Sequence, residues 1–324
     1  MLSEILSKLP SQAANPALLV GYETGDDAAV YKINDNQGVV ATTDFFMPIV
    51  DDPFDYGRIA AANALSDVYA IGGKPIMALA IAGFPMDKMT TQQVQNTLAG
   101  GTQICNEANV PVAGGHTIDA PEPIYGLAVV GLVNPNKIKR NDAAIDGDVL
   151  ILGKGLGVGI LGAALNKNEL DEAGYRELVE SAVKLNSIGA ELSEISGVHA
   201  VTDVTGFGIT GHLMEICSGS GLSANLDLDK LPILPSASDY AQKGYSTGAG
   251  NRNWDSFGDN IRLPKNLEVW QKNILTDPQT SGGLLLSCSQ DHADIILSLF
   301  HEQKYEHACI IGEMTIGGPH INVK

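Results

Sequence analysis

The chain has 324 residues, which is enough for two domains of ordinary size. Hydrophobic residues make up 44% of it and charged residues 18%, as in a globular protein, and no apolar run reaches the ~20 residues of a membrane span. The net charge of −18 argues against nucleic acid and anionic membranes as partners, because both require clustered Lys and Arg. Residues 1–4 lack the basic start of a secretory signal, so we expect a cytoplasmic protein.

The first half of the chain predicts an α/β layer structure, because strand-like and helical segments alternate. Residues 1–9 have an amphipathic helical pattern, and residues 10–16 resemble a linker. Strands are expected at residues 28–33, 39–46, 76–84 and 124–133, and helices at residues 58–71 and 91–108.

A polar segment rich in turn formers, residues 134–148, predicts a domain boundary. We therefore expect an N-terminal domain over residues 1–145 and a C-terminal α/β domain over residues 146–324. The second half predicts strands at 148–152, 200–202 and 284–288, an apolar segment at 160–165 after a Gly-rich turn, helical periodicity over 172–195, and a helix at 208–217.

The four cysteines predict neither a zinc site nor a redox pair. Cys105, Cys217, Cys288 and Cys309 form no CxxC pair, and each lies in or beside an apolar run. We expect reduced cysteines in the core.

Two acidic segments near the first strands have both a functional and an ordinary interpretation. Asp26 and Asp27 follow Gly25, where adjacent carboxylates repel each other unless a donor or cation is near, but Gly and Asp are also common in simple turns. Asp44 lies among apolar strand residues and either needs a partner or caps the end of the strand.

Asp67 is the most informative carboxylate. It lies in an Ala-rich segment that is apolar nearly all round, a pattern typical of a buried helix, and Asn63 lies on the same helical face four residues earlier. A buried carboxylate is costly unless it is paired or binds a metal. Asp67 is therefore either a metal or ligand contact or part of a buried hydrogen-bond network.

Three further polar segments are candidate ligand contacts or simple turns. Residues 114–117 (GGHT) combine a glycine pair, which permits close backbone approach, with a threonine that could bind phosphate; the alternative is a tight turn with His116 in the core. Asp203 ends a strand before a helix, and residues 277–283 form a second Gly-terminated polar loop.

A GxGxxG match at residues 157–162 is not interpreted as a dinucleotide site. The fingerprint requires a second strand ending in an acidic residue ~20 positions later, whereas residues 172–195 have a helical pattern. There is no GxxxxGK[ST], so any nucleotide site is not of the P-loop kind.

Asp27, Asp44, Asp67 and Asp203 come from four separate segments. If they converge, they suit Mg²⁺, which takes oxygen ligands and bridges to substrate phosphates. Spacing alone does not show whether they converge.

Five segments resemble selenophosphate synthetase (selenide, water dikinase), and the likeness covers essentially the whole chain. Residues 44–53 (DFFMPIVDDP) and 113–123 (AGGHTIDAPEP) are specific to that family, whereas some others recur across the wider aminoimidazole-ribonucleotide-synthetase-like superfamily. The other matching segments are residues 57–75, 202–212 and 276–283.

The resemblance implies a two-domain α/β (α+β) fold of the aminoimidazole-ribonucleotide-synthetase type. It implies a homodimer that pairs through a β-barrel-like interface of the N-terminal domains, with ATP and several Mg²⁺ ions bound there. The implied reaction converts selenide, ATP and water to selenophosphate, AMP and phosphate. The residues that match the family's metal ligands are Asp27, Asp67 and Asp203, and those that match its nucleotide contacts are Thr24, Gly25, Asp26, Asp44, Asp67, Gly115, His116 and Thr117.

The start of the chain departs from the family pattern. Family members have a Gly-rich lead with a reactive Cys or selenocysteine and a nearby Lys before the segment that aligns with residues 2–9, so we expect both catalytic residues to lie before residue 1. Either the lead was trimmed, or the gene encodes selenocysteine upstream of an incorrectly assigned start. Three functions follow: an impaired synthetase that binds Mg-ATP, a superfamily relative that phosphorylates another small substrate, or an ATP-binding protein without catalysis.

Overall fold

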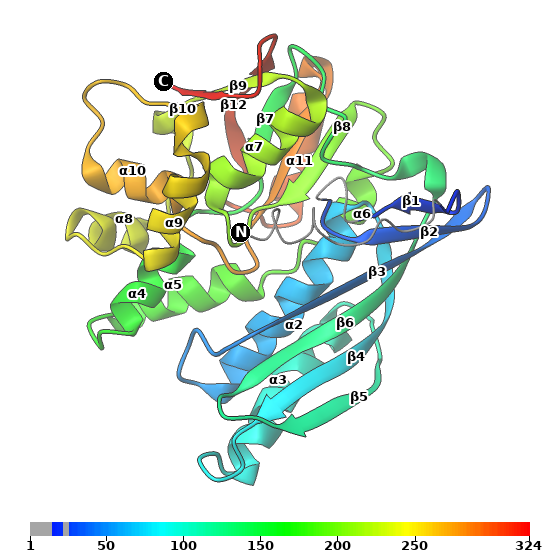
Figure 1. The fold of residues 1–324 in the computed structure, drawn as a ribbon, viewed down its shortest axis with the longest axis vertical. Helices are drawn as coiled ribbons and strands as arrows, with labels where there is room; N and C mark the ends of the chain where they lie inside the picture. Colours follow the sequence, from blue (N-terminus) through cyan, green and yellow to red (C-terminus); the bar gives the residue numbers. More distant parts are fainter. Residues whose placement is uncertain (1–14, 22–25) are drawn as a thin grey trace.

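The computed structural model describes residues 15–21 and 26–324 (Figure 1). The helix predicted at residues 1–9 lies outside the described residues, as do Thr24 and Gly25. Two sheets organise the described part of the chain, one built from residues before 134 and the other from residues after 148. The predicted boundary at residue 145/146 lies in the connection between them and stays a prediction.

The first sheet has six strands in the order β1 (Leu18–Val20), β2 (Ala29–Asn34), β3 (Gln37–Phe46), β6 (Ile124–Val133), β4 (Lys74–Phe84) and β5 (Val112–Asp119). Neighbouring strands are antiparallel except β4 and β5, which are parallel. The four predicted strands are confirmed as β2, β3, β4 and β6. The expected turn at Gly114–Thr117 is wrong, because these residues lie inside β5.

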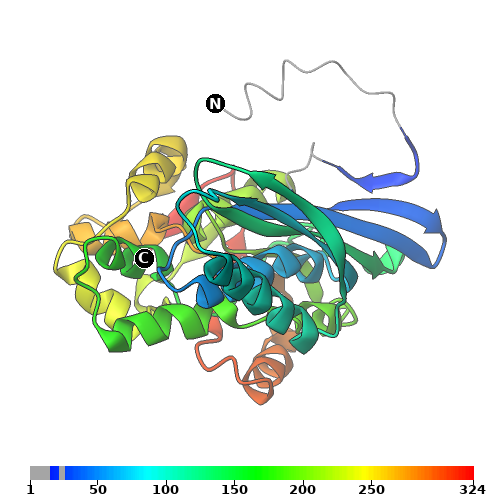
Figure 2. The ribbon, with the colours of Figure 1, turned by 90° about the horizontal axis from the view of Figure 1, so that it is seen from below.

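Helices α2 (Pro53–Ala70) and α3 (Thr91–Glu107) cover one face of this sheet (Figure 2). Asp52 caps α2 by accepting hydrogen bonds from the N–H groups of Phe54 and Asp55, which are orphan donors of the first turn. The two helices approach closely at glycines: a Cβ on Gly100 would lie 2.0 Å from the backbone oxygen of Phe54. Both predicted helices are confirmed.

The second sheet has seven strands in the order β10 (Ile261–Arg262), β13 (Ile321–Val323), β9 (Ser223–Leu226), β12 (Cys309–Thr315), β7 (Val149–Leu152), β11 (Leu284–Cys288) and β8 (Val198–Asp203). Its α-helices are α4 (Val158–Leu165), α5 (Glu172–Val183), α6 (Gly189–Leu192), α7 (Gly208–Ser220), α8 (Pro235–Gln242), α9 (Gly248–Phe257), α10 (Val269–Thr276) and α11 (Ala293–Glu302). Short 3-10 helices occur at Pro135–Lys137, Leu228–Lys230, Gly258–Asn260 and Gln290–His292.

The predicted helical stretch at 172–195 is two helices, α5 and α6, with a break between them. Asn186 lies in the break and is buried, and its side chain donates to the backbone oxygen of Gly282 at 2.8 Å. A buried side-chain amide needs hydrogen-bond partners, and Asn186 finds this one from the break between the two helices. The strands predicted at 148–152, 200–202 and 284–288 are confirmed as β7, β8 and β11.

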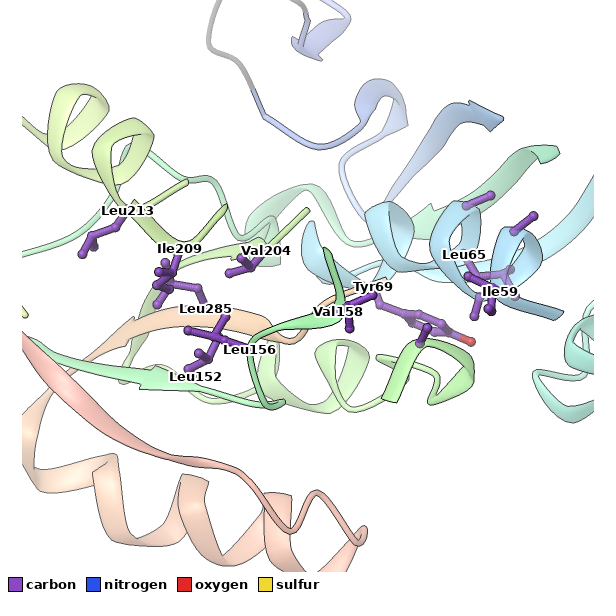
Figure 3. Close-up of a cluster of buried hydrophobic side chains, with 14 of the residues drawn as sticks. Ile59, Leu65, Tyr69, Leu152, Leu156, Val158, Val204, Ile209, Leu213 and Leu285 are labelled. Carbon is purple, nitrogen blue, oxygen red and sulfur yellow. The ribbon is translucent and has the colours of Figure 1, made fainter. Parts of the chain in front are cut away.

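Helix α2 joins the two halves of the core. It packs on β3, β4 and β6 of the first sheet and also contacts α5, α6 and β8 of the second half. One cluster of buried side chains accordingly includes Ile59 and Leu65 from α2 together with Leu152 and Leu285 from the second sheet (Figure 3). This double contact explains why the sequence of α2 is apolar nearly all round.

The cysteines have the predicted character. All four are free; Cys105, Cys217 and Cys288 are buried and Cys309 is partly buried. Burial raises the pKa of the Cys105 thiol to about 11 and that of Cys217 to about 12, which disfavours the reactive thiolate. None of the helices in the described ranges is long and apolar enough to cross a membrane.

Candidate functional site

Helix α2 presents three polar side chains, Asn63, Ser66 and Asp67, where it passes between the two sheets. Their spacing of three and four residues places them on one helical face. Asn63 and Ser66 are buried, so each needs a hydrogen-bond partner from another segment. These partners bring carboxylates from distant parts of the chain to the helix.

Asn63 links the first sheet to the second half. Its Nδ2 donates to Oδ2 of Asp44 on β3, and its Oδ1 accepts the N–H of Ser281 at 2.6 Å. Asp44 is therefore an interior strand residue with a side-chain partner, and the alternative that it caps the strand end is wrong.

Ser66 and Asp67 form the other hydrogen bonds of this helical face. Ser66 donates through Oγ to Oδ2 of Asp203 at the end of β8, and it accepts from Nδ2 of Asn186 at 2.7 Å. Asp67 accepts a hydrogen bond from Oγ1 of Thr42 at 2.5 Å. Through Ser66 and Asp67, α2 is thus hydrogen-bonded to strand residues of both sheets.

Asp27 completes the group from the segment before β2. Its Oδ1 accepts from Oγ1 of Thr202, the neighbour of Asp203 on β8, at 2.9 Å. The structure therefore brings Asp27, Asp44, Asp67 and Asp203 together from four segments, which the sequence raised only as a possibility.

Burial and the charge of Asp203 disfavour the ionised forms of the other three carboxylates. Burial, followed by the charges of Asp203 and Asp67, raises the pKa of Asp27 well above its usual range. Burial and the charges of Asp203 and Asp44 do the same to the pKa of Asp67, and burial with the charge of Asp203 raises the pKa of Asp44 to about 6. Such shifts mark negative charge that the surrounding groups do not neutralise.

A cation at this group would remove that repulsion, and the oxygen-only chemistry of the site fits Mg²⁺. Among the residues that the structure describes, no three His, Cys, Asp or Glu side chains form a group that could hold a metal ion by themselves. Mg²⁺ commonly binds one or two carboxylates and completes its shell with water and substrate phosphates. The donor set therefore fits a metal that arrives with a phosphate ligand.

Lys154 is a site residue that the sequence reasoning missed. It follows β7, is buried, and donates through Nζ to the backbone oxygens of Lys184 and Ser281 at 2.5 and 2.6 Å. Burial lowers its pKa to about 7, and the charge of Asp203 opposes that change. The sequence feature that could have identified Lys154 is its position between two glycines, directly after a buried strand.

The polar loop after α10 caps helix α4. Oε1 of Gln279 accepts the N–H groups of Gly157 and Val158 at 3.1 Å, and Oδ2 of Asp277 accepts those of Gly159 and Ile160 at 3.0 and 3.3 Å. In a dinucleotide fold these N–H groups bind the pyrophosphate. Here protein oxygens occupy them, which supports the rejection of the GxGxxG match.

The remaining predicted contacts lie in two other places of the described chain. Oδ1 of Asp26 accepts the N–H of Asn141 at 2.8 Å, in the connection between the sheets. Gly115, His116 and Thr117 are exposed on the edge strand β5, so a core position for His116 is wrong. Thr24 and Gly25 lie outside the described residues.

The register of the first sheet measures the separation of these residues. Asp44 pairs with Leu127, Leu127 with Ala80, and Ala80 with Gly115, so one row crosses four strands. Three strand spacings correspond to about 14 Å. Within one chain, residues 115–117 therefore do not touch the carboxylate group.

Comparisons with known proteins agree with this architecture. Residues 25–133 match the family model described as AIR synthase related protein, N-terminal domain, and residues 146–323 match its C-terminal domain. In fold, the chain resembles the thiamine-monophosphate kinase of Stenotrophomonas maltophilia, with a TM-score of 0.69 and 20% identity over 100% of this chain and 94% of that one. It also resembles the hydrogenase maturation protein HypE in complex with ATP, with a TM-score of 0.68 and 19% identity over 94% and 83% of the two chains.

The expected two-domain α/β (α+β) fold of the aminoimidazole-ribonucleotide-synthetase type is thereby confirmed. Curated relatives are far more similar in sequence. The selenide, water dikinase of Pseudomonas straminea is 57% identical over 100% of this chain and 91% of that protein. The selenide, water dikinase of Rhizobium meliloti is 50% identical over 100% of this chain and 93% of that protein. The chain belongs to the selenide, water dikinase family.

Proposed function

We propose that this protein catalyses the ATP-dependent synthesis of selenophosphate from selenide and water, with release of AMP and phosphate. The observation that carries the proposal is the group of four buried carboxylates around α2, in which the charge of Asp203 raises the pKa of Asp27, Asp44 and Asp67 beyond the effect of burial. Family membership at 57% identity supplies the reaction.

The proposed metal ligands are Asp27, Asp67 and Asp203, and Asp44 would contact the Mg-nucleotide. Thr202, Thr42 and Ser66 each donate to one of the three ligands. Such donors orient a carboxylate and leave its second oxygen for a metal. Mg²⁺ would supply neutralisation of the phosphate charge, which a protein of net charge −18 does not offer at this group.

A homodimer is part of the proposal, because α2 and α3 cover only one face of the first sheet (Figure 2) and apolar side chains are exposed on its strands. The large apolar side chains exposed on its strands are Leu18, Tyr31, Ile33, Phe45, Ile76, Leu79 and Ile118. A contiguous apolar face of this kind is typical of an interface between subunits. We propose that Gly115, His116 and Thr117, which lie on the rim of this face, contact the nucleotide across that interface.

Replacing Ile118 with lysine is expected to weaken the dimer at least tenfold, because it places a charge in the apolar interface. Ile118 is 49% exposed in the single chain. Analytical ultracentrifugation over a concentration series measures the change. Ile316→Lys is the matched control, since Ile316 is 78% exposed and lies outside the first sheet. Equal dissociation of both variants would argue against this interface.

The reaction is tested by phosphorus NMR of the purified protein with ATP, Mg²⁺ and selenide. A selenophosphate resonance, with AMP and phosphate formed in equal amounts, is expected. Turnover of ATP that is independent of selenide and requires another acceptor would indicate a kinase of different specificity. Binding of Mg-ATP without turnover under any condition would indicate an ATP-binding protein.

We also propose that the protein has domains over residues 1–145 and 146–324 and a cytoplasmic location. The domain division is supported by the two sheets, which share α2 but no strand. Limited proteolysis between residues 134 and 148 would test it.

A further inference from the structure

A cavity of about 590 Å³ lies in the second half of the chain. Its walls are α5, the loop after β7 and the loop between α11 and β12, and its basic lining residues are Lys154, Arg176, Lys184, Lys304 and His307. Asp27, Asp44, Asp67 and Asp203 do not line it.

The charge of this cavity is opposite to that of the protein. The whole chain has 20 Lys and Arg against 38 Asp and Glu, yet the lining has four Lys and Arg against Glu177, Glu180 and Glu306. Glu177 accepts the N–H of Ser236 at 2.8 Å, so one of its carboxylate oxygens already has a hydrogen-bond partner. A local excess of positive charge in an acidic protein favours an anionic ligand.

Two of the lysines are held in place by neutral groups. Nζ of Lys184 donates to the backbone oxygen of Gln303 at 2.8 Å and lies 4.5 Å from the centre of the Tyr305 ring. Lys154 donates to two backbone oxygens. Carbonyl and aromatic partners fix the position of an ammonium group without forming an ion pair with it, so neither lysine is neutralised by a carboxylate in these contacts.

Lys304 occupies a position at which glycine is favoured. It follows α11 with φ 61°, and the N–H of Tyr305 bonds to the oxygen of Phe300 at 3.0 Å, as in a Schellman motif. The other described non-glycine residues with positive φ are Asn109, Asn168 and Ser281. A lysine tolerates this conformation poorly, so its presence at the cavity indicates a use for its charge.

We propose that this cavity is a binding site for a phosphate-bearing anion, either inorganic phosphate or a phosphomonoester, contacted by Arg176, Lys184 and Lys304. Guanidinium and ammonium groups form charge-assisted hydrogen bonds with phosphate oxygens, and the planar fork of Arg176 can bind two of them at once. The site is distinct from the proposed ATP site and does not depend on the proposed reaction.

The test uses calorimetric titration of the full chain with inorganic phosphate, with a chelator present. Without divalent cations the carboxylate group repels phosphate, so binding reports on the cavity. Lys304→Gly is expected to weaken binding about tenfold, because it removes one charge-assisted contact. The same variant is expected to unfold at a higher temperature, because glycine tolerates positive φ. A residue with a structural role alone would not show this combination.

Three further variants make the result decisive. Lys265→Gly changes the net charge equally at an exposed position outside the cavity and should leave the affinity unchanged. Arg176→Glu, on an exposed helix position, should abolish binding. Asp67→Asn should leave it unchanged, which separates this site from the proposed ATP site. No binding of phosphate to the unmodified protein, or equal weakening by Lys304→Gly and Lys265→Gly, would overturn the proposal.

Competition distinguishes the two sources of the phosphate group. Displacement of bound phosphate by AMP at similar concentrations identifies a phosphomonoester site. Displacement by sulfate but not by AMP identifies a site for the free inorganic anion.

Discussion

Replacing Asp203 with asparagine is expected to reduce the affinity for Mg-ATP at least about 100-fold and to stabilise the metal-free protein. The affinity falls because a proposed metal ligand loses its charge, whereas the amide keeps the shape of the side chain. The metal-free protein gains about 1 to 2 kcal/mol, because one buried charge that repels Asp27, Asp44 and Asp67 is removed. Calorimetric titration with Mg-ATP and thermal unfolding with a chelator measure the two effects.

Asp148→Asn is the matched control for this experiment. Asp148 is also buried, but it accepts from the N–H of Ile145 and faces His199 at 2.9 Å, so its charge has partners. Its replacement should lower the stability and leave the affinity for Mg-ATP unchanged. Loss of stability in Asp203→Asn together with full Mg-ATP binding would refute the metal role of Asp203.

The metal-free protein is expected to become more stable by about 2 kcal/mol when the pH falls from 7.5 to 5.0. Asp44 and Asp277 have pKa values raised from the usual 3.8 to about 6 and about 7, chiefly by burial. A carboxyl whose pKa is raised on folding binds its proton more tightly in the folded state, so its ionisation above that pKa destabilises the fold. The stability is therefore gained as the pH falls through 7 and 6, and the magnitude includes a reduction for solvent screening at Asp44.

Chemical denaturation at a series of pH values measures this dependence. Asp44→Asn should flatten the lower part of the pH dependence, near pH 6. Mg²⁺ with ATP should oppose that part, because the metal binds the ionised carboxylate group, and should leave the part due to Asp277 unchanged. A pH dependence near pH 6 that Asp44→Asn leaves unchanged would contradict the proposed repulsion within the carboxylate group.

Local patterns in the sequence predicted much of the fold. Alternating and continuous apolar runs located β2, β3, β4 and β6, and the apolar helix with one buried carboxylate, Asp67, located α2. Strand β5 was missed because Gly114 and Gly115 are typical of turns, whereas here Gly115 permits a close approach to β4: a Cβ on it would lie 2.1 Å from the oxygen of Ala80.

The sequence by itself determined the family, the alternation of strands and helices, and the four acidic residues that we propose for a Mg-nucleotide site. Only the tertiary structure decided that these residues meet, since Ser66 and Asp203 are 137 positions apart and their contact depends on how α2 packs between two sheets. It also decided that Lys154 is buried beside Asp203 and that Lys184 and Lys304 share a cavity with Arg176. Periodicity reports the environment of a residue along its own element, whereas the partners of a buried charge come from whichever segments the fold places against it.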